Sequence, residues 1–152
     1  MFPAKYIPIW SLFTKEVLRF LKVGTQTILG PAISSLLFLV VFNLALGRSI
    51  ETINGVKFVN FIAPGLIMMT ILQNAFANAA ASIGQSKFQG NIVDILMSPL
   101  SDLELTFGYI GGAIVRGLIC GIITFIVIIF FVPLSIHSYS ALVFYSLMGS
   151  LM

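Results

Sequence analysis

Residues 113–132, AIVRGLICGIITFIVIIFFV, form an apolar run in which Arg116 is the only charged residue. A helix of this length, at about 1.5 Å per residue, matches a hydrocarbon core about 30 Å thick. One arginine at the centre of a span costs about 2.5–3.5 kcal/mol, and the many Leu, Ile, Val and Phe side chains of the run outweigh that cost. The stretch therefore predicts a membrane-spanning helix that ends at Pro133.

The composition of the whole chain points to the same class of protein. Hydrophobic residues make up 59% of it and charged residues only 9%, against about 25% charged in soluble domains. The net charge is +3, but the basic residues flank apolar runs and do not form a face where basic and aromatic side chains alternate. This distribution argues against a nucleic-acid partner. We therefore expect an all-α integral membrane protein, a polytopic helical bundle.

Further apolar runs divide the rest of the chain. The second contains Pro64-Gly65, which predicts a tilt or a break there. The fourth stops at Met152 after about 21 Å of helix, so we expect the chain to be the N-terminal part of a longer protein. The predicted division is 1–27, a leader with an amphipathic helix; 28–47, the first span; 48–57, an external loop; 58–84, the second span; 85–104, a cytoplasmic loop; 105–133, the third span; 134–138, an external loop; and 139–152, the truncated start of a fourth span.

Orientation is predicted from the distribution of lysine and arginine. The leader and residues 85–104 together contain five of these residues, whereas the two loops on the opposite side contain two. Because lysine and arginine are enriched in cytoplasmic flanks, we expect the N-terminus and residues 85–104 to face the cytoplasm.

Polar residues inside the second span need partners. Asn74, Asn78 and Ser82 recur every four residues and therefore share one helical face. Lipid offers an amide group no hydrogen-bond partner, so this face must meet protein or a wet cavity. Interhelical hydrogen bonding and the lining of a substrate path both remain open.

The third span carries two kinds of signal for helix contacts. Gly108 with Gly112, and Gly117 with Gly121, form two GxxxG spacings that permit close helix approach. Arg116 lies near the predicted cytoplasmic edge, where it either extends to the lipid headgroups or takes an interhelical or functional role.

The leader contains an amphipathic helix at residues 9–22. One predicted face is apolar and the other is polar or basic. The apolar face holds Trp10, Phe13, Val17 and Leu21, and the other holds Ser11, Lys15, Arg19 and Lys22. Such a helix either lies in the plane of the lipid headgroups or packs on the protein itself.

A short helix is predicted within residues 89–101, QGNIVDILMSPLS. Gly90 interrupts the preceding helix, Asn91 is a candidate N-cap, Asp94 suits the positive helix end, and Pro99 limits the length. Its apolar face consists of Ile92, Ile95 and Leu96. A helix this short is marginal in water, so it is expected to dock, either on its own bundle or on another protein.

Three stretches together resemble the membrane subunit of type-2 ABC exporters: FIAPGLIMM at 61–69, the run at 89–101, and YIGGAIVRGLICG at 109–121. The resemblance covers essentially the whole chain. It implies a six-span permease in the bacterial inner membrane that pairs with a second copy, binds a P-loop ATPase, and moves substrate outward by alternating access when the ATPase closes. It also implies an interfacial helix with Phe13, Lys15, Glu16 and Arg19, and a coupling helix with Asn91, Ile92, Asp94, Ile95, Leu96, Ser98 and Pro99. Members of the family often have glutamate where this chain has Asp94.

The sequence lacks motifs of nucleotide-binding, metal-binding and hydrolytic sites. It has no G-x-x-x-x-G-K-[ST] loop, so ATP and Mg²⁺ are expected on the partner ATPase and no cofactor on this chain. No metal or hydrolase signature occurs, and His137 has no candidate second ligand beside it. We therefore expect a transport subunit and not an enzyme.

The alternatives are a structural or channel-type membrane subunit outside the ABC class, whose 89–101 helix packs on its own bundle, and a lipid-handling membrane enzyme. The transported substrate is not indicated.

Overall fold

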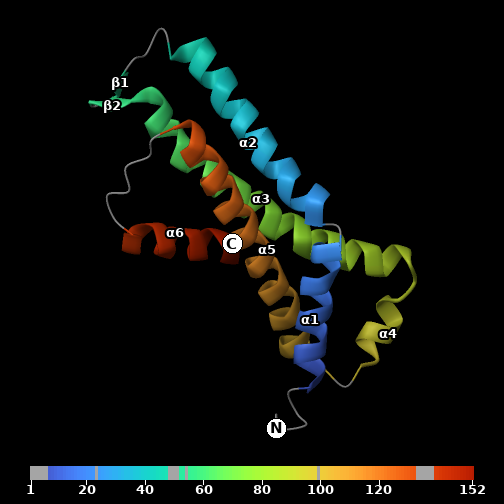
Figure 1. Ribbon diagram of the computed structural model, residues 1–152. Helices are drawn as coiled ribbons and strands as arrows, with labels where there is room; N and C mark the ends of the chain where they lie inside the picture. Colours follow the sequence, from blue (N-terminus) through green and yellow to red (C-terminus); the bar gives the residue numbers. More distant parts are fainter. Residues whose placement is uncertain (1–6, 23, 48–51, 54, 99, 133–138) are drawn as a thin grey trace.

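The computed structural model describes residues 7–22, 24–47, 52–53, 55–98, 100–132 and 139–152 (Figure 1). Nearly all of these residues are helical. The elements are α1 (Ile7–Lys22), α2 (Gly24–Leu46), β1 (Thr52–Ile53), β2 (Val56–Lys57), α3 (Phe58–Phe88), α4 (Ile92–Leu96), α5 (Asp102–Phe131) and α6 (Tyr139–Leu151). Arg48, Pro99 and His137 lie outside the described residues.

Three of the described helices are long and apolar enough to cross a membrane. They are Gln26–Leu46 within α2, Phe58–Phe88 and Asp102–Phe131. In the most apolar 18-residue stretch of each helix, at most 33% is buried within this chain. The greater part of their surface is therefore left for lipid or other protein. The predicted class, a helical bundle of an integral membrane protein, is confirmed.

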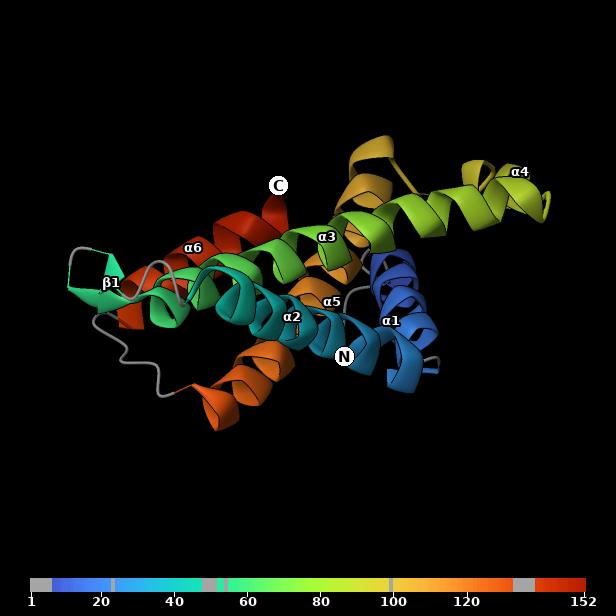
Figure 2. The ribbon, with the colours of Figure 1, turned by 90° about the horizontal axis from the view of Figure 1, so that it is seen from above.

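The bundle is built around α3 and α5, which have the most extensive contact with each other (Figures 1 and 2). Helix α2 packs on both of them, α1 packs on the first part of α5, and α6 lies against α3 and α5. One apolar core lies where α2, α3 and α5 meet near the hairpin. It contains Leu39, Ala63, Leu66, Ile128 and Val132.

Helix α3 continues without interruption through Pro64 and Gly65, so of the two predicted alternatives the break is wrong, and the tilt stays a prediction. Pro64 removes only one backbone N–H donor, and its neighbours Ala63 and Leu66 are buried in the apolar core, which holds this turn in place. The helix also extends to Phe88, one turn past the predicted end. Its 31 residues measure about 46 Å, so it is longer than a hydrocarbon core.

The hairpin and α4 lie at opposite ends of α3 (Figure 1). The hairpin pairs Thr52 with Lys57 and Ile53 with Val56, and Gly55 at its turn has a positive φ of 81°. Glycine takes this conformation without steric cost. The two connections are thus separated by the full length of a membrane-length helix, which is the arrangement required for loops on opposite sides of a bilayer.

Candidate functional site

Helix α1 buries a face made of Leu12, Glu16 and Phe20, which are spaced four residues apart. The predicted apolar face was centred elsewhere on the helix. Trp10 and Leu21 from that face are 62% and 48% exposed, so that face is left for lipid or other protein, and the position of α1 in the plane of the lipid headgroups stays a prediction. The buried face is the one that packs on α5, where Leu12 and Glu16 lie against Gly108 and Gly112.

The first GxxxG pair of α5 receives α1. A Cβ at Gly112 would lie 2.7 Å from the Cβ of Glu16, and one at Gly108 would lie 3.6 Å from the Cβ of Leu12. A Cβ at Gly111, between them, would lie 3.1 Å from the ring of Phe13. The absence of side chains at these positions therefore lets α1 approach the backbone of α5 directly.

The second GxxxG pair of α5 receives α3. A Cβ at Gly117 would lie 3.0 Å from the Cβ of Ala75, and one at Gly121 would meet the side chain of Ile71. Each of the two glycine pairs therefore docks a different helix, and α5 is held between α1 and α3.

A buried polar cluster lies where α1, α3 and α5 cross; it consists of Glu16, Arg19, Asn78, Ser82 and Arg116. Glu16 is 1% exposed. The Ser82 hydroxyl donates a hydrogen bond of 2.7 Å to its Oε1, and the Arg19 guanidinium lies 3.0 Å from its Oε2. The carboxylate of Glu16 is therefore held from both α1 and α3, as a buried charge requires.

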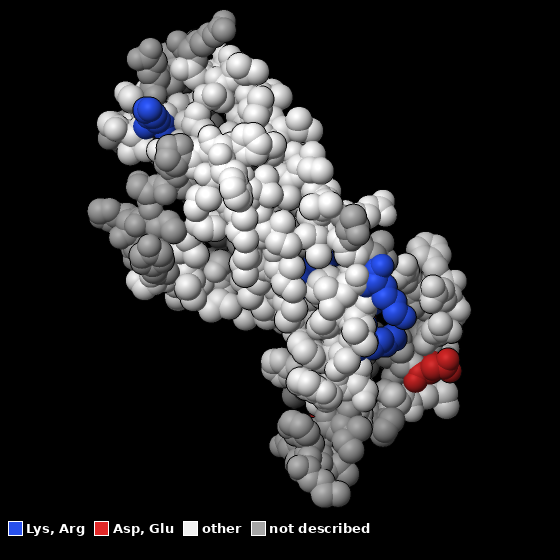
Figure 3. Space-filling view, in the orientation of Figure 1, with Lys and Arg blue, Asp and Glu red and all other residues white. Residues whose placement is uncertain are grey.

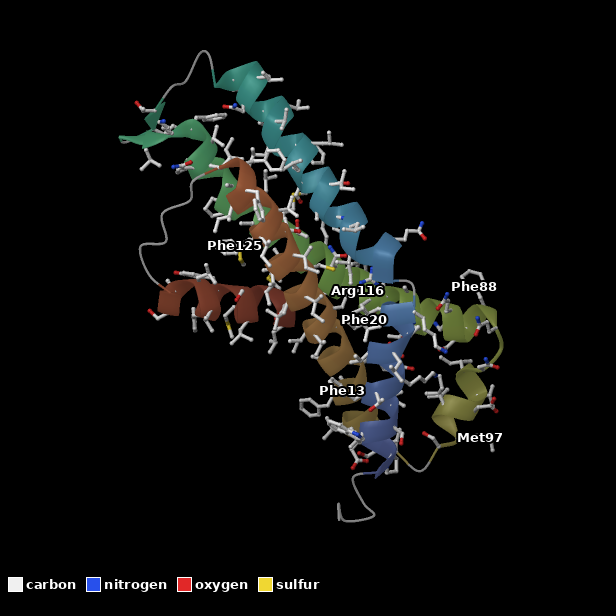
Figure 4. All side chains as sticks on the ribbon, viewed as in Figure 1. Phe13, Phe20, Phe88, Met97, Arg116 and Phe125 are labelled. Carbon is white, nitrogen blue, oxygen red and sulfur yellow. The ribbon has the colours of Figure 1, made fainter. Side chains whose placement is uncertain are left out.

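Asn78 joins the three helices of the polar cluster. Its side chain is fully buried, and its Oδ1 accepts hydrogen bonds from Arg19 at 3.2 Å and from Arg116 at 3.4 Å. Arg19 also donates to the main-chain oxygen of Asn78 at 3.2 Å. Figure 4 shows Arg116 in the region where α1, α3 and α5 cross. Asn78, Ser82 and Arg116 thus make interhelical contacts, and the lining of a substrate path by this face stays a prediction.

Asn74 belongs to the same face of α3 but not to the polar cluster, because its amide donates to the main-chain oxygen of Thr70 on its own helix, at 2.9 Å. Two further hydrogen bonds tie α2 to its neighbours. The hydroxyls of Ser35 and Thr70 are 2.7 Å apart, and Cys120 donates from Sγ to the main-chain oxygen of Thr27 at 3.6 Å. These two links were not predicted from the sequence.

The four leader residues assigned by resemblance do not share one face of α1. Phe13 is half-buried over Gly111, whereas Lys15 is exposed. Glu16 and Arg19 belong to the polar cluster. Glu16 is the residue whose role the sequence analysis missed, and its i,i+3 spacing to Arg19 was the available signal.

The predicted cap of α4 is wrong. Gly90 has a positive φ of 74° and makes the turn after α3. Asn91 then has φ −79° and ψ 0°, which is a helical conformation, whereas a capping residue is extended. Its side chain therefore makes no cap and donates to Gln89 Oε1 at 3.4 Å.

None of the residues of α4 is buried. Ile92 and Ile95 are half-buried, Asp94 is exposed, and the Ser98 hydroxyl donates to the main-chain oxygen of Ile95. Large apolar side chains at this end of the molecule are exposed, and Figure 4 shows Phe88 and Met97 at the outer end of α3 and beside α4. They are Phe88 at 95%, Val93 at 55%, Leu96 at 69% and Met97 at 80% exposed. Phe88, Val93 and Met97 were not among the predicted site residues.

Helix α5 begins with a capping box that the sequence analysis overlooked. The Ser101 hydroxyl accepts a hydrogen bond from the backbone N–H of Glu104, and the Glu104 carboxylate accepts one from the backbone N–H of Ser101. The pattern S-x-x-E ahead of an apolar run was the signal. The box fixes the start of α5 soon after the end of α4.

Comparison with known proteins gives relatives for this arrangement. The chain is 37% identical over 134 residues to proteins named inner membrane transport permease YadH from Escherichia coli K12, Escherichia coli O157:H7 and Shigella flexneri. The match covers 88% of this chain and 52% of each relative, so the chain spans about half the length of these relatives. No solved structure matches the chain. The family model for ABC-2 type transporters matches residues 8–152, and the chain therefore belongs to the ABC-2 type transporter membrane family.

Proposed function

We propose that this chain is part of the permease of an ATP-driven exporter in the bacterial inner membrane, with the N-terminus and α4 on the cytoplasmic side. ATP is hydrolysed on a separate P-loop ATPase, and α4 is the contact with that partner. The names of the relatives support the membrane and the transport function. The observation that carries the ATPase contact is the uncovered apolar surface of α4 and its surroundings.

The exposure of α4 favours a partner over packing on its own bundle. A five-residue helix has little stability of its own, so it needs a docking surface. Its own bundle covers Ile92 and Ile95 only in part and leaves Leu96 and Met97 mostly open. Exposed apolar groups of this size at one site are typical of a surface that another protein covers.

The connections of α4 suggest how it passes on a motion of the ATPase. Helix α4 follows α3 through Gly90 and precedes α5, whose start is fixed at Ser101. Displacement of α4 therefore acts on the ends of both long helices. Under this proposal the helices move as rigid bodies, two copies of the permease form the transport path between them, and substrate leaves by alternating access.

A co-purification experiment tests the ATPase contact. The tagged protein is purified in mild detergent from its own host, and the bound P-loop ATPase is quantified by mass spectrometry and ATP hydrolysis. Leu96→Asp and Asp94→Lys are expected to weaken the association about 30-fold, the effect of losing a hot spot of about 2 kcal/mol. Val56→Asp, at an exposed position in the hairpin, is the matched control. Equal recovery of the ATPase with Leu96→Asp and with the control would contradict the proposal.

A further inference from the structure

A groove of about 810 Å³ runs along the outer side of α1. We call it the basic groove. It is lined by Trp10, Ser11, Thr14, Lys15, Leu18, Arg19 and Lys22. Figure 3 shows lysine and arginine side chains gathered beside α1, below a wide uncharged surface, with acidic side chains next to them on the side of α4. All of these residues belong to α1, so the basic groove is a shallow, open hollow along one helix and not an enclosed pocket.

The charge of the basic groove is not balanced from within. Lys15, Arg19 and Lys22 line it, and none of the described lining residues is acidic. Glu16 lies on the opposite face of α1, where it is already engaged by Arg19 and Ser82. The groove therefore attracts an anion.

The polar cluster behind the groove adds to this attraction, because it lacks one negative charge. It contains the two guanidinium groups of Arg19 and Arg116 but only one carboxylate, that of Glu16. The acceptor that both guanidinium groups share, Asn78 Oδ1, is neutral. Arg116 Nε is buried and has no hydrogen-bond partner among the described residues. Arg19 lines the basic groove and also belongs to the polar cluster. An anion beside Arg19 would therefore compensate the positive charge of both.

The surroundings of the cations favour an amphiphile over a free anion. Trp10 and Leu18 line the same groove and are exposed, so apolar and basic groups lie side by side. Helix α2, the first membrane-length helix, begins at Gly24, directly beyond Lys22 and Val23. From these observations we propose that the basic groove binds the phosphate headgroup of an anionic phospholipid, with the acyl chains following the apolar surface toward α2.

Lipid binding to the purified protein tests this proposal. The protein in a non-ionic detergent is titrated with phosphatidylglycerol or phosphatidylcholine, and bound lipid is measured by native mass spectrometry. Phosphatidylglycerol is expected to bind at least tenfold more tightly. Lys15→Gln with Lys22→Gln is expected to weaken its binding about 30-fold, since each cation near a lipid surface contributes about a fivefold effect. Lys15→Arg with Lys22→Arg is expected to retain binding.

The controls separate a site from general charge attraction and a lipid from a free anion. Lys57→Gln with Lys87→Gln removes the same charge from exposed positions outside the groove and is expected to leave binding unchanged. Asn78→Asp supplies the missing negative charge internally and is expected to weaken binding about fivefold, as the loss of one cation does. The proposal would be overturned if the two lipids bound equally or if the Lys57 and Lys87 control lost as much binding as the Lys15 and Lys22 variant. It would also be overturned if Asn78→Asp bound the lipid unchanged, or if inorganic phosphate displaced the lipid at the lipid's own concentration. All these measurements are made without the ATPase, so the result is distinct from that of the co-purification test.

Discussion

Gly112→Ala tests whether the close approach of α1 and α5 holds this end of the bundle together. The added Cβ would lie 2.7 Å from the Cβ of Glu16 and 3.5 Å from its Cγ. Carbon atoms normally separate by about 3.5–4.0 Å, so the overlap with the Cβ is about 1 Å. Relief requires α1 to move outward, and this motion pulls Glu16 away from Ser82. Overpacking of this kind costs about 1–3 kcal/mol.

The matched control is Gly84→Ala. A Cβ at Gly84 would meet nothing within 4 Å, so the change is free of packing effects. Both substitutions lie inside helices and gain about 1 kcal/mol of helix propensity. The free energy of unfolding, measured by titration with a denaturing detergent, is therefore expected to be about 1–3 kcal/mol lower for Gly112→Ala than for Gly84→Ala. Equal stability of the two variants would refute the inference that Gly112 is a point of close helix contact.

Three further predictions follow from individual contacts. Leu12→Cys with Gly108→Cys, in a background that lacks the native cysteine, is expected to form a disulfide on mild oxidation, because the two Cβ positions are 3.6 Å apart; an unshifted band on a non-reducing gel would contradict the packing of α1 on α5. Glu16→Gln keeps an acceptor for the serine but removes the charge, and is expected to lower the free energy of unfolding by about 3 kcal/mol, measured by the same titration. Ser35→Ala removes only the interhelical hydrogen bond to Thr70 and is expected to cost about 0.6 kcal/mol, so a loss as large as that of Glu16→Gln would show that this link has a larger role.

The sequence predicted the membrane helices well because the property that defines them is local. A run of apolar residues must span lipid wherever its neighbours lie, and residues 113–132 illustrate this. Of the tilt or break predicted at Pro64, the break was wrong because continuity of a helix depends also on packing, and Ala63 and Leu66 are buried in a core that local sequence does not reveal. The missed capping box at Ser101 is different, because its signal was present in the sequence.

The candidate site was predictable only in part for the same reason. The spacing of Asn78 and Ser82 required partners, since lipid provides none. The identity of those partners depends on the rotation of α1, and the glycines of α5 set that rotation. Hydrophobic periodicity identified the exposed apolar face with Trp10, but not the face that packs on α5, where Glu16 lies against Gly112. The burial of Glu16 is a tertiary result, and the sequence indicated only its pairing with Arg19, through their i,i+3 spacing.

Two different kinds of contact hold α1, α3 and α5 together, and this bears on the proposed transport function. The glycine contacts at Gly112 and Gly117 act at short range and resist compression, whereas the hydrogen bonds to Asn78 resist separation. Together they oppose motion of the three helices relative to one another in either direction. Helix α4 has no comparable contact, since none of its residues is buried and Gly90 forms the turn that leads into it. If α4 receives a motion from an ATPase, that motion is therefore expected to displace α1, α3 and α5 as one body and not to separate them, and the resulting change of access must occur at surfaces outside this three-helix unit.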